Sequence, residues 1–170
     1  MTTRRTILAA LCLTGLAPTL AAAEETAACG HSAWSIERER AAFAGSLPTV
    51  ASGSALPAGS PAAVVTLTPA AELSLPVPSD RPAKPGTYGG YVTAAAPAEP
   101  GTYQVTLSEE AWIDVSQDGR TTLKADAFAG KIGCPGIHKS VRFTLGAVPV
   151  IIEVSRVPGP QIKVGLFKAE

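Results

Sequence analysis

The sequence has few of the residues that most often build catalytic and metal sites. Its 170 residues include two histidines, three cysteines and one methionine, and aromatic residues make up 5% of the chain. Charged residues make up 16%, and the formal net charge is zero. Without a basic stripe or interleaved aromatics, the chain has little with which to neutralise phosphates or stack on bases. We therefore expect no nucleic-acid partner.

The sequence also lacks an apolar run long enough to span a bilayer. The run over residues 7–20 has about 14 residues, whereas a spanning helix needs about 20. Arg4 and Arg5 precede the run and Ala21, Ala22 and Ala23 follow it, which is the layout of a cleavable secretory signal. We predict that residues 1–23 are a signal peptide and that the protein is periplasmic or secreted, without a transmembrane anchor. The paired arginines leave open whether the general or the twin-arginine route exports it.

Signal cleavage decides the expected state of the cysteines. It leaves about 147 residues with 14 acidic and 12 basic groups, enough for one domain. Cys29 and Cys134 then meet an oxidising compartment, where a disulfide is the default. The closed loop of about 105 residues would contribute roughly 4–5 kcal/mol in the chain-entropy model.

Both histidines lie close to these cysteines, in ACGH and GCPGIH. Cys29, His31, Cys134 and His138 together supply two thiolates and two imidazoles, a ligand set that suits zinc or copper. Thiolates must be reduced to serve as ligands, and the expected compartment opposes this. We therefore predict the disulfide and no cofactor, and we keep the metal site as an alternative.

Composition divides the mature chain into two parts. Residues 24–62 are expected to form an N-terminal helix and a linker rich in Pro, Ala, Gly and Ser. Helix formers occupy residues 32–44, with Ser32 as a possible cap and Gly45 at the end. The charged residues at 37–40 are expected to form a solvated face.

Alternation of apolar and polar residues dominates the second part, residues 63–170. It predicts strands at 63–68, 87–94, 102–108, 111–116, 120–124, 140–145, 148–155 and 161–167, and a further candidate strand, interrupted by Pro76, at 72–77. We predict an all-β domain, an antiparallel β-sandwich of jelly-roll or immunoglobulin-like topology with about seven or eight strands. Tyr88, Tyr91 and Trp112 form a candidate binding surface on one sheet, although these aromatic residues could equally cover the opposite sheet.

The stretches GTYQVTLS, AWIDVSQDG, IHKSVRFTL and PVIIEVS resemble small secreted bacterial β-sandwiches of the pre-peptidase C-terminal type. The similarity covers roughly residues 85–167 and rests on turn-and-strand patterning. It implies a non-catalytic accessory module that binds or stabilises proteins or polysaccharide, although no catalytic domain accompanies it here.

The signal, Cys29, Trp34, the Pro-rich middle and Gly-Cys-Pro-Gly also resemble short secreted bacterial proteins labelled homogentisate 1,2-dioxygenase. That enzyme family has a longer chain and an iron site of two histidines and a carboxylate. His31 and His138 are the only histidines of this chain.

These observations favour a non-catalytic exported accessory or binding protein of the bacterial envelope, fastened by a disulfide. Its expected partner is an envelope protein or a polysaccharide. A Gly-x-Ser-x-Gly nucleophile motif is absent, and we predict no enzymatic activity. The alternatives are a periplasmic metal-binding protein and, from the second resemblance alone, an aromatic-ring dioxygenase.

Overall fold

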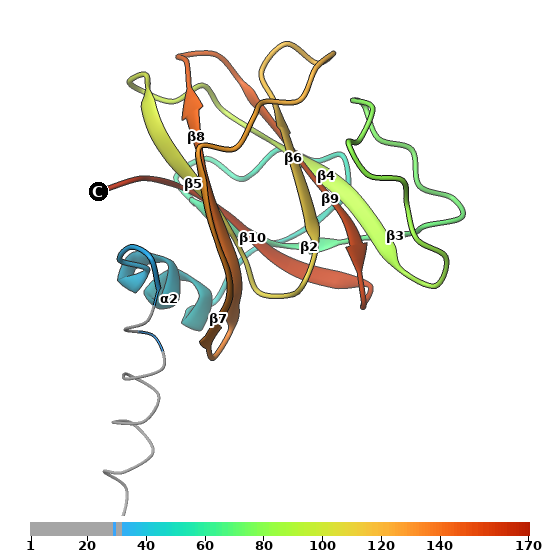
Figure 1. Cartoon of the computed structure of the whole chain (residues 1–170), viewed down its shortest axis with the longest axis horizontal. Helices are drawn as coiled ribbons and strands as arrows, with labels where there is room; N and C mark the ends of the chain where they lie inside the picture. Colours follow the sequence, from blue (N-terminus) through green and yellow to red (C-terminus); the bar gives the residue numbers. More distant parts are fainter. Residues whose placement is uncertain (1–28, 30–31) are drawn as a thin grey trace, which may run out of the picture.

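The computed structural model describes residue 29 and residues 32–170, which form a β-sandwich with one short helix (Figure 1). The helix is α2 (Glu37–Ala44). The ten strands are β1 (Thr49–Ala51), β2 (Ala62–Thr66), β3 (Thr68–Pro69), β4 (Tyr88–Ala94), β5 (Gly101–Leu107), β6 (Trp112–Ser116), β7 (Ala127–Cys134), β8 (Ile137–Leu145), β9 (Val150–Val157) and β10 (Gln161–Lys168). The prediction of an all-β sandwich with an N-terminal helix is confirmed, with more strands than expected.

Two sheets make up the sandwich. The larger has the order β1-β2-β10-β5-β8-β7, and the smaller has the order β3-β4-β9-β6. Neighbouring strands are antiparallel, apart from β1 and β2, which run parallel. Two short strands thus extend the sheet edges, β1 within the Pro- and Gly-rich segment 46–61 and β3 directly after β2.

The alternating pattern of the sequence produces the core between the sheets. In β5 the side chains of Tyr103, Val105 and Leu107 are buried against the inner face of the smaller sheet, to which β9 contributes Ile152 and Val154. Successive residues of a strand point to opposite faces of the sheet, so every second residue points into this layer, and in these strands that residue is apolar. Fully burying each aliphatic side chain contributes roughly 1.5–3 kcal/mol.

The outer face of the larger sheet is covered by the N-terminal segment. Ile36 and Phe43 are buried beside the sheet in a second apolar cluster that also contains the cysteines. The helix begins at Glu37 and not near Ser32 as predicted, and no side chain caps it. The expectation of a solvated face over residues 37–40 is wrong for Glu39, which is 1% exposed and accepts a hydrogen bond from Gln104.

The outer face of the smaller sheet is covered by a Pro-rich segment, residues 73–82, which we call the strap. It lies between β3 and β4, green in Figure 1, on the opposite side of the molecule from α2. The prediction of a strand at 72–77 is wrong: the segment has no strand pairing, and Val77 is buried. Its prolines cannot donate to a ladder, and its hydrogen bonds to the sheet are made with side chains of β6 and β9.

Two further sequence predictions fail near β6. Residues 120–124 form a loop, in which the Leu123 N–H donates to the carbonyl of Val115 at 2.7 Å. The strand β7 was not predicted because AFAGKIGC has neither alternation nor β-branched enrichment. In the part of the chain that the structure describes, no helix has both the length and the apolar character needed to cross a membrane.

Candidate functional site

The candidate site is a groove where the edges of the two sheets meet. Two hollows lie here, of about 390 Å³ and about 410 Å³, and share Trp112, Phe128 and Lys139 in their walls. We call them together the Trp112 groove. Trp112 comes from β6, the last strand of the smaller sheet, and Phe128 from β7, the last strand of the larger one.

Phe128 gives the groove an exposed apolar residue. Its side chain is 72% exposed, more than that of any other large hydrophobic residue described. The neighbouring Ala127 and Gly130 are also exposed. Among the described residues, β7 pairs only with β8, so one backbone edge of β7 has no strand partner. Such an edge can pair with an added strand.

Cationic side chains surround the first of the two hollows. Arg81, Lys139 and Arg156 line it, with Glu110 as the only acidic residue in its wall. The guanidinium of Arg81 lies 4.5 Å from the centroid of the Trp112 ring, and the Lys139 amino group lies 5.5 Å from it. Positive charge around an exposed groove attracts ligands that carry negative charge.

Lys139 links the two sheets across this groove. Its Nζ donates to the carbonyl of Ala111 at 3.0 Å, so a β8 side chain reaches the start of β6. Burial lowers the pKa of Lys139, and the charge of Arg81 acts in the same direction, whereas Glu110 and Asp114 oppose the shift. A partly desolvated ammonium group attracts an anionic ligand more strongly than a fully hydrated one.

Beneath the strap, beside the groove, lie two buried carboxyl groups. Asp114 of β6 and Glu153 of β9 are register partners and are 4% and 1% exposed. Asp114 Oδ1 accepts from Trp112 Nε1 at 2.9 Å, and its Oδ2 accepts from Ser79 Oγ at 2.5 Å. Glu153 Oε1 accepts from the Val77 N–H at 2.8 Å. Burial raises the pKa of Glu153 to about 7; the hydrogen bond from the Val77 N–H acts in the opposite direction, and the charge of Asp114 adds to the increase.

Of the three aromatic residues predicted as a binding surface, only Trp112 lines the groove. Tyr88 packs against the main core. Tyr91 is half-buried, and a Cβ added at Gly53 would lie 3.3 Å from its hydroxyl group. Tyr88 and Tyr91 both belong to β4, and β9 separates that strand from β6. The three residues therefore do not form one continuous patch.

The cysteines form the expected disulfide. Cys29 and Cys134 are joined with a Cα–Cα distance of 4.7 Å, and both are buried in the cluster that contains Phe43. Of the proposed metal ligands, His31 lies outside the described residues, and His138 lines the Trp112 groove. Across residues 29 and 32–170 no group of three or more His, Cys, Asp or Glu side chains could hold a metal.

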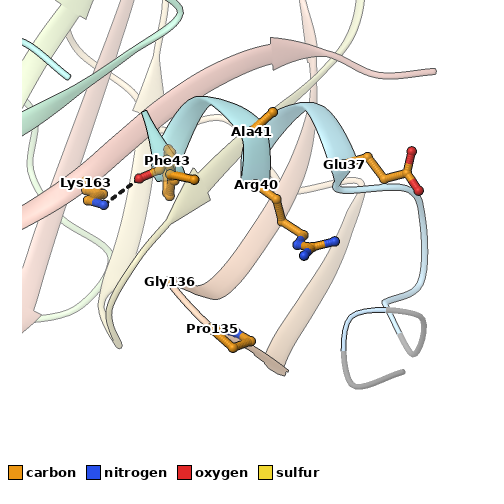
Figure 2. Close-up of a pocket in the computed structure, with 8 residues that line it drawn as sticks. Glu37, Arg40, Ala41, Phe43, Pro135, Gly136 and Lys163 are labelled. Atoms are coloured by element: carbon orange, nitrogen blue, oxygen red, sulfur yellow. Dashed lines mark hydrogen bonds between the residues drawn. The ribbon is translucent and has the colours of Figure 1, made fainter. Parts of the chain in front are cut away.

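A third hollow, of about 470 Å³, lies between α2 and the turn that joins β7 to β8 (Figure 2). Figure 2 shows Arg40 reaching from the helix toward Pro135 and Gly136, while Glu37 points away. Lys163 is engaged at the end of the helix, where its Nζ donates to the Phe43 carbonyl at 2.6 Å. The described wall of this hollow thus contains two cations, Arg40 and Lys163, fewer than the Trp112 groove.

Sequence reasoning found Trp112 and His138 but missed Phe128, Arg81, Lys139 and the buried carboxyl pair. Phe128 lies in a segment without a strand pattern, and Arg81 lies in a Pro-rich turn. The alternation in β6 did place Asp114 and Trp112 on the face opposite the core, but it could not show that the strap covers that face. A search of family models, curated proteins and solved structures found no match to this chain.

Proposed function

We propose that the chain is a non-catalytic, exported binding module of the bacterial envelope whose Trp112 groove holds an extended acidic peptide segment of a partner protein. One observation carries the proposal: the exposed side chain of Phe128 lies on an edge strand and lines both hollows, the first of which has three cationic residues in its wall. Strand addition to such an edge gives main-chain hydrogen bonds, while flanking pockets select side chains.

The geometry favours a peptide over a polysaccharide. Sugar rings bind proteins largely by stacking on open aromatic faces, and with Arg81 over the ring of Trp112 the groove offers one exposed ring, that of Phe128. Phe128 stands on one face of the edge strand β7, so a peptide that pairs with the strand can also contact the ring. Acidic side chains on such a peptide would meet Arg81, Lys139 and Arg156.

The disulfide supports the proposed export. It joins the segment before α2 to the end of β7, and such bonds persist in oxidising compartments. It also anchors the far end of the strand that would receive the peptide. A fixed edge lowers the entropy cost of binding.

The test is a titration of the disulfide-bonded protein with a capped peptide of about eight alternating Glu and Thr residues, which matches the length of β7. We expect salt-sensitive binding and slower hydrogen exchange of β7 amides. The same peptide with Gln in place of Glu should bind more weakly. Phe128→Ser and Arg81→Gln should each weaken binding about tenfold or more.

Val148→Ser is the matched control, because Val148 is the other exposed large hydrophobic residue, 46% exposed, and lies outside the groove. It should leave binding unchanged. An affinity for the peptide that is unchanged in Phe128→Ser would contradict the proposal. Oligogalacturonate is the second probe: binding of this acidic sugar alone, sensitive to Phe128→Ser, would replace the peptide with a polysaccharide.

A further inference from the structure

The strap supplies one wall of the Trp112 groove. Arg81 lies over the ring of Trp112, and Asp80 lines the second hollow. Both residues belong to the strap and are exposed. The wall of the groove is therefore complete only when the strap is docked on the smaller sheet.

Polar contacts with the smaller sheet fasten the strap. The Val77 N–H donates to Glu153 Oε1 at 2.8 Å, and Ser79 Oγ donates to Asp114 Oδ2 at 2.5 Å. Farther along, Arg156 Nε donates to the carbonyl of Pro82 at 3.0 Å, and the Thr122 hydroxyl donates to Asp80 at 3.1 Å. Two of these four hydrogen bonds thus have buried carboxyl groups as acceptors, those of Glu153 and Asp114.

Within the described residues no cationic side chain forms a hydrogen bond or ion pair with Glu153; of the nearby cations, Lys139 interacts with Asp114 and Arg156 donates to the Pro82 carbonyl. Asp114 faces it from β6 and Tyr91 faces it from β4. The strap carries Asp80 and Arg81 above the sheet, and their recorded contacts are with Thr122 and Trp112. Within the described residues, neither buried carboxyl group forms an ion pair.

Two buried polar atoms on this face lack a hydrogen-bond partner. They are Glu153 Oε2 and Ser155 Oγ, and both residues are almost completely buried. A charged carboxylate with an unpartnered oxygen beside a second carboxylate is costly in such a place, whereas a protonated carboxyl group removes the repulsion. Undocking of the strap would instead expose both groups to water.

We propose that the strap is a proton-operated latch on the Trp112 groove, closed over a protonated Glu153 and released when this carboxyl group ionises beside Asp114. Release withdraws Arg81 from Trp112, so the groove loses a cation and its affinity for an acidic segment falls. The effect on binding rests on the proposed function, whereas the movement of the strap does not.

The direction follows from proton linkage. Burial raises the pKa of Glu153 to about 7 from its ordinary 4.5, so the docked strap holds the proton more tightly than the released strap. The docked state is favoured fully below pH 4.5 and loses that advantage as the pH rises toward 7. Over this interval the population of the released strap should rise by roughly tenfold per pH unit.

The first experiment follows the strap in the ligand-free, disulfide-bonded protein. Hydrogen-exchange protection of the Val77 amide, corrected for the intrinsic pH dependence of exchange, should fall roughly tenfold per unit between about pH 5 and 7. In Glu153→Gln the protection should stay flat. Glu109→Gln, which removes an exposed carboxylate, should behave like the wild type. Constant protection in the wild type, or a matching fall in Glu153→Gln, would overturn the latch.

The second experiment adds the acidic peptide at pH 5 and pH 8. Affinity should fall at the higher pH in the wild type and change less in Glu153→Gln. His138 also faces the groove but is common to both proteins, so the difference between them reports Glu153. If the peptide does not bind at pH 5 but the exchange protection of the Val77 amide shows the expected pH dependence, the proposed function alone is overturned. If the peptide binds equally well at both pH values while the strap is released at the higher pH, the coupling between strap release and peptide affinity is overturned.

Discussion

Glu39 of α2 and Gln104 of β5, 65 positions apart in the sequence, share a buried hydrogen bond on the outer face of the larger sheet. Gln104 Oε1 also accepts from Arg142 Nε at 3.1 Å, and the Arg142 guanidinium lies 4.3 Å from the centroid of the Trp34 ring. This network joins the N-terminal segment to two strands. The helix is therefore an integral part of the fold.

The first prediction concerns this network. Glu39→Ala removes the main acceptor and leaves the buried Gln104 amide with only the long bond of 3.5 Å to the Ser35 carbonyl, which costs about 1–3 kcal/mol in the free energy of unfolding. Glu37→Ala, an exposed change on the same helix, should stay within about 0.5 kcal/mol of the wild type. Urea unfolding measures both. Equal effects of the two changes would contradict the role of Glu39.

Much of the sandwich could be predicted because burial on one face leaves an alternating pattern. The strands that contain Val105, Ile113, Val141, Ile152 and Val164 were expected with nearly their observed bounds. β7 was missed because its apolar and Gly residues do not alternate. The segment 72–77 was predicted as a strand because its apolar residues alternate, but its prolines prevent ladder pairing.

The candidate site was harder to predict because it depends on what covers the sheets. Alternation placed Gln104 and Asp114 on faces opposite the core, where polar residues usually meet water. The structure buries both under non-sheet segments. No local pattern shows which loop will cover a sheet face, so Arg81 and Phe128 could not be connected to Trp112. The disulfide was predictable because an expected export signal and two cysteines after it already favour a crosslink.

The second prediction concerns Cys29–Cys134. Replacing both cysteines with Ser removes a crosslink between positions 105 residues apart, which costs up to about 4–5 kcal/mol in the chain-entropy model. We expect the apparent stability of the double variant, measured by urea unfolding, to match that of the wild type with its disulfide reduced. A loss below about 1 kcal/mol would show that the second apolar cluster holds the N-terminal segment without the bond.

The third prediction concerns the close approach of the strap to β4. A Cβ added at Gly89 would lie 2.5 Å from Leu73 Cδ2 and 2.9 Å from the Val154 carbonyl oxygen. Because the second contact is with backbone, Gly89→Ala should cost about 1–3 kcal/mol through overpacking. Gly159→Ala is the control, since a Cβ there meets nothing within 4 Å. Thermal unfolding compares the two, and equal melting temperatures would contradict the close approach of Leu73 and the Val154 carbonyl to Gly89.

The fourth prediction concerns the pH dependence of global stability. Since burial raises the pKa of Glu153 to about 7, its contribution to folding is present below pH 4.5 and is lost as the pH rises toward 7. Asp118 acts in the opposite direction: hydrogen bonds from the Thr121 and Arg120 amides lower its pKa, so its contribution is lost in stronger acid. The two groups together favour greatest stability in mildly acidic solution.

Glu153→Gln isolates the first of these effects because it keeps an acceptor for the Val77 N–H but cannot ionise. At pH 8 the variant should be more stable than the wild type by about 1–3 kcal/mol, and near pH 4.5 the difference should largely vanish. Urea unfolding at the two pH values measures this difference in the free energy of unfolding. If Glu153→Gln were equally destabilised at both, Glu153 would contribute through packing and hydrogen bonding alone, because only an ionising group makes the difference between the proteins depend on pH.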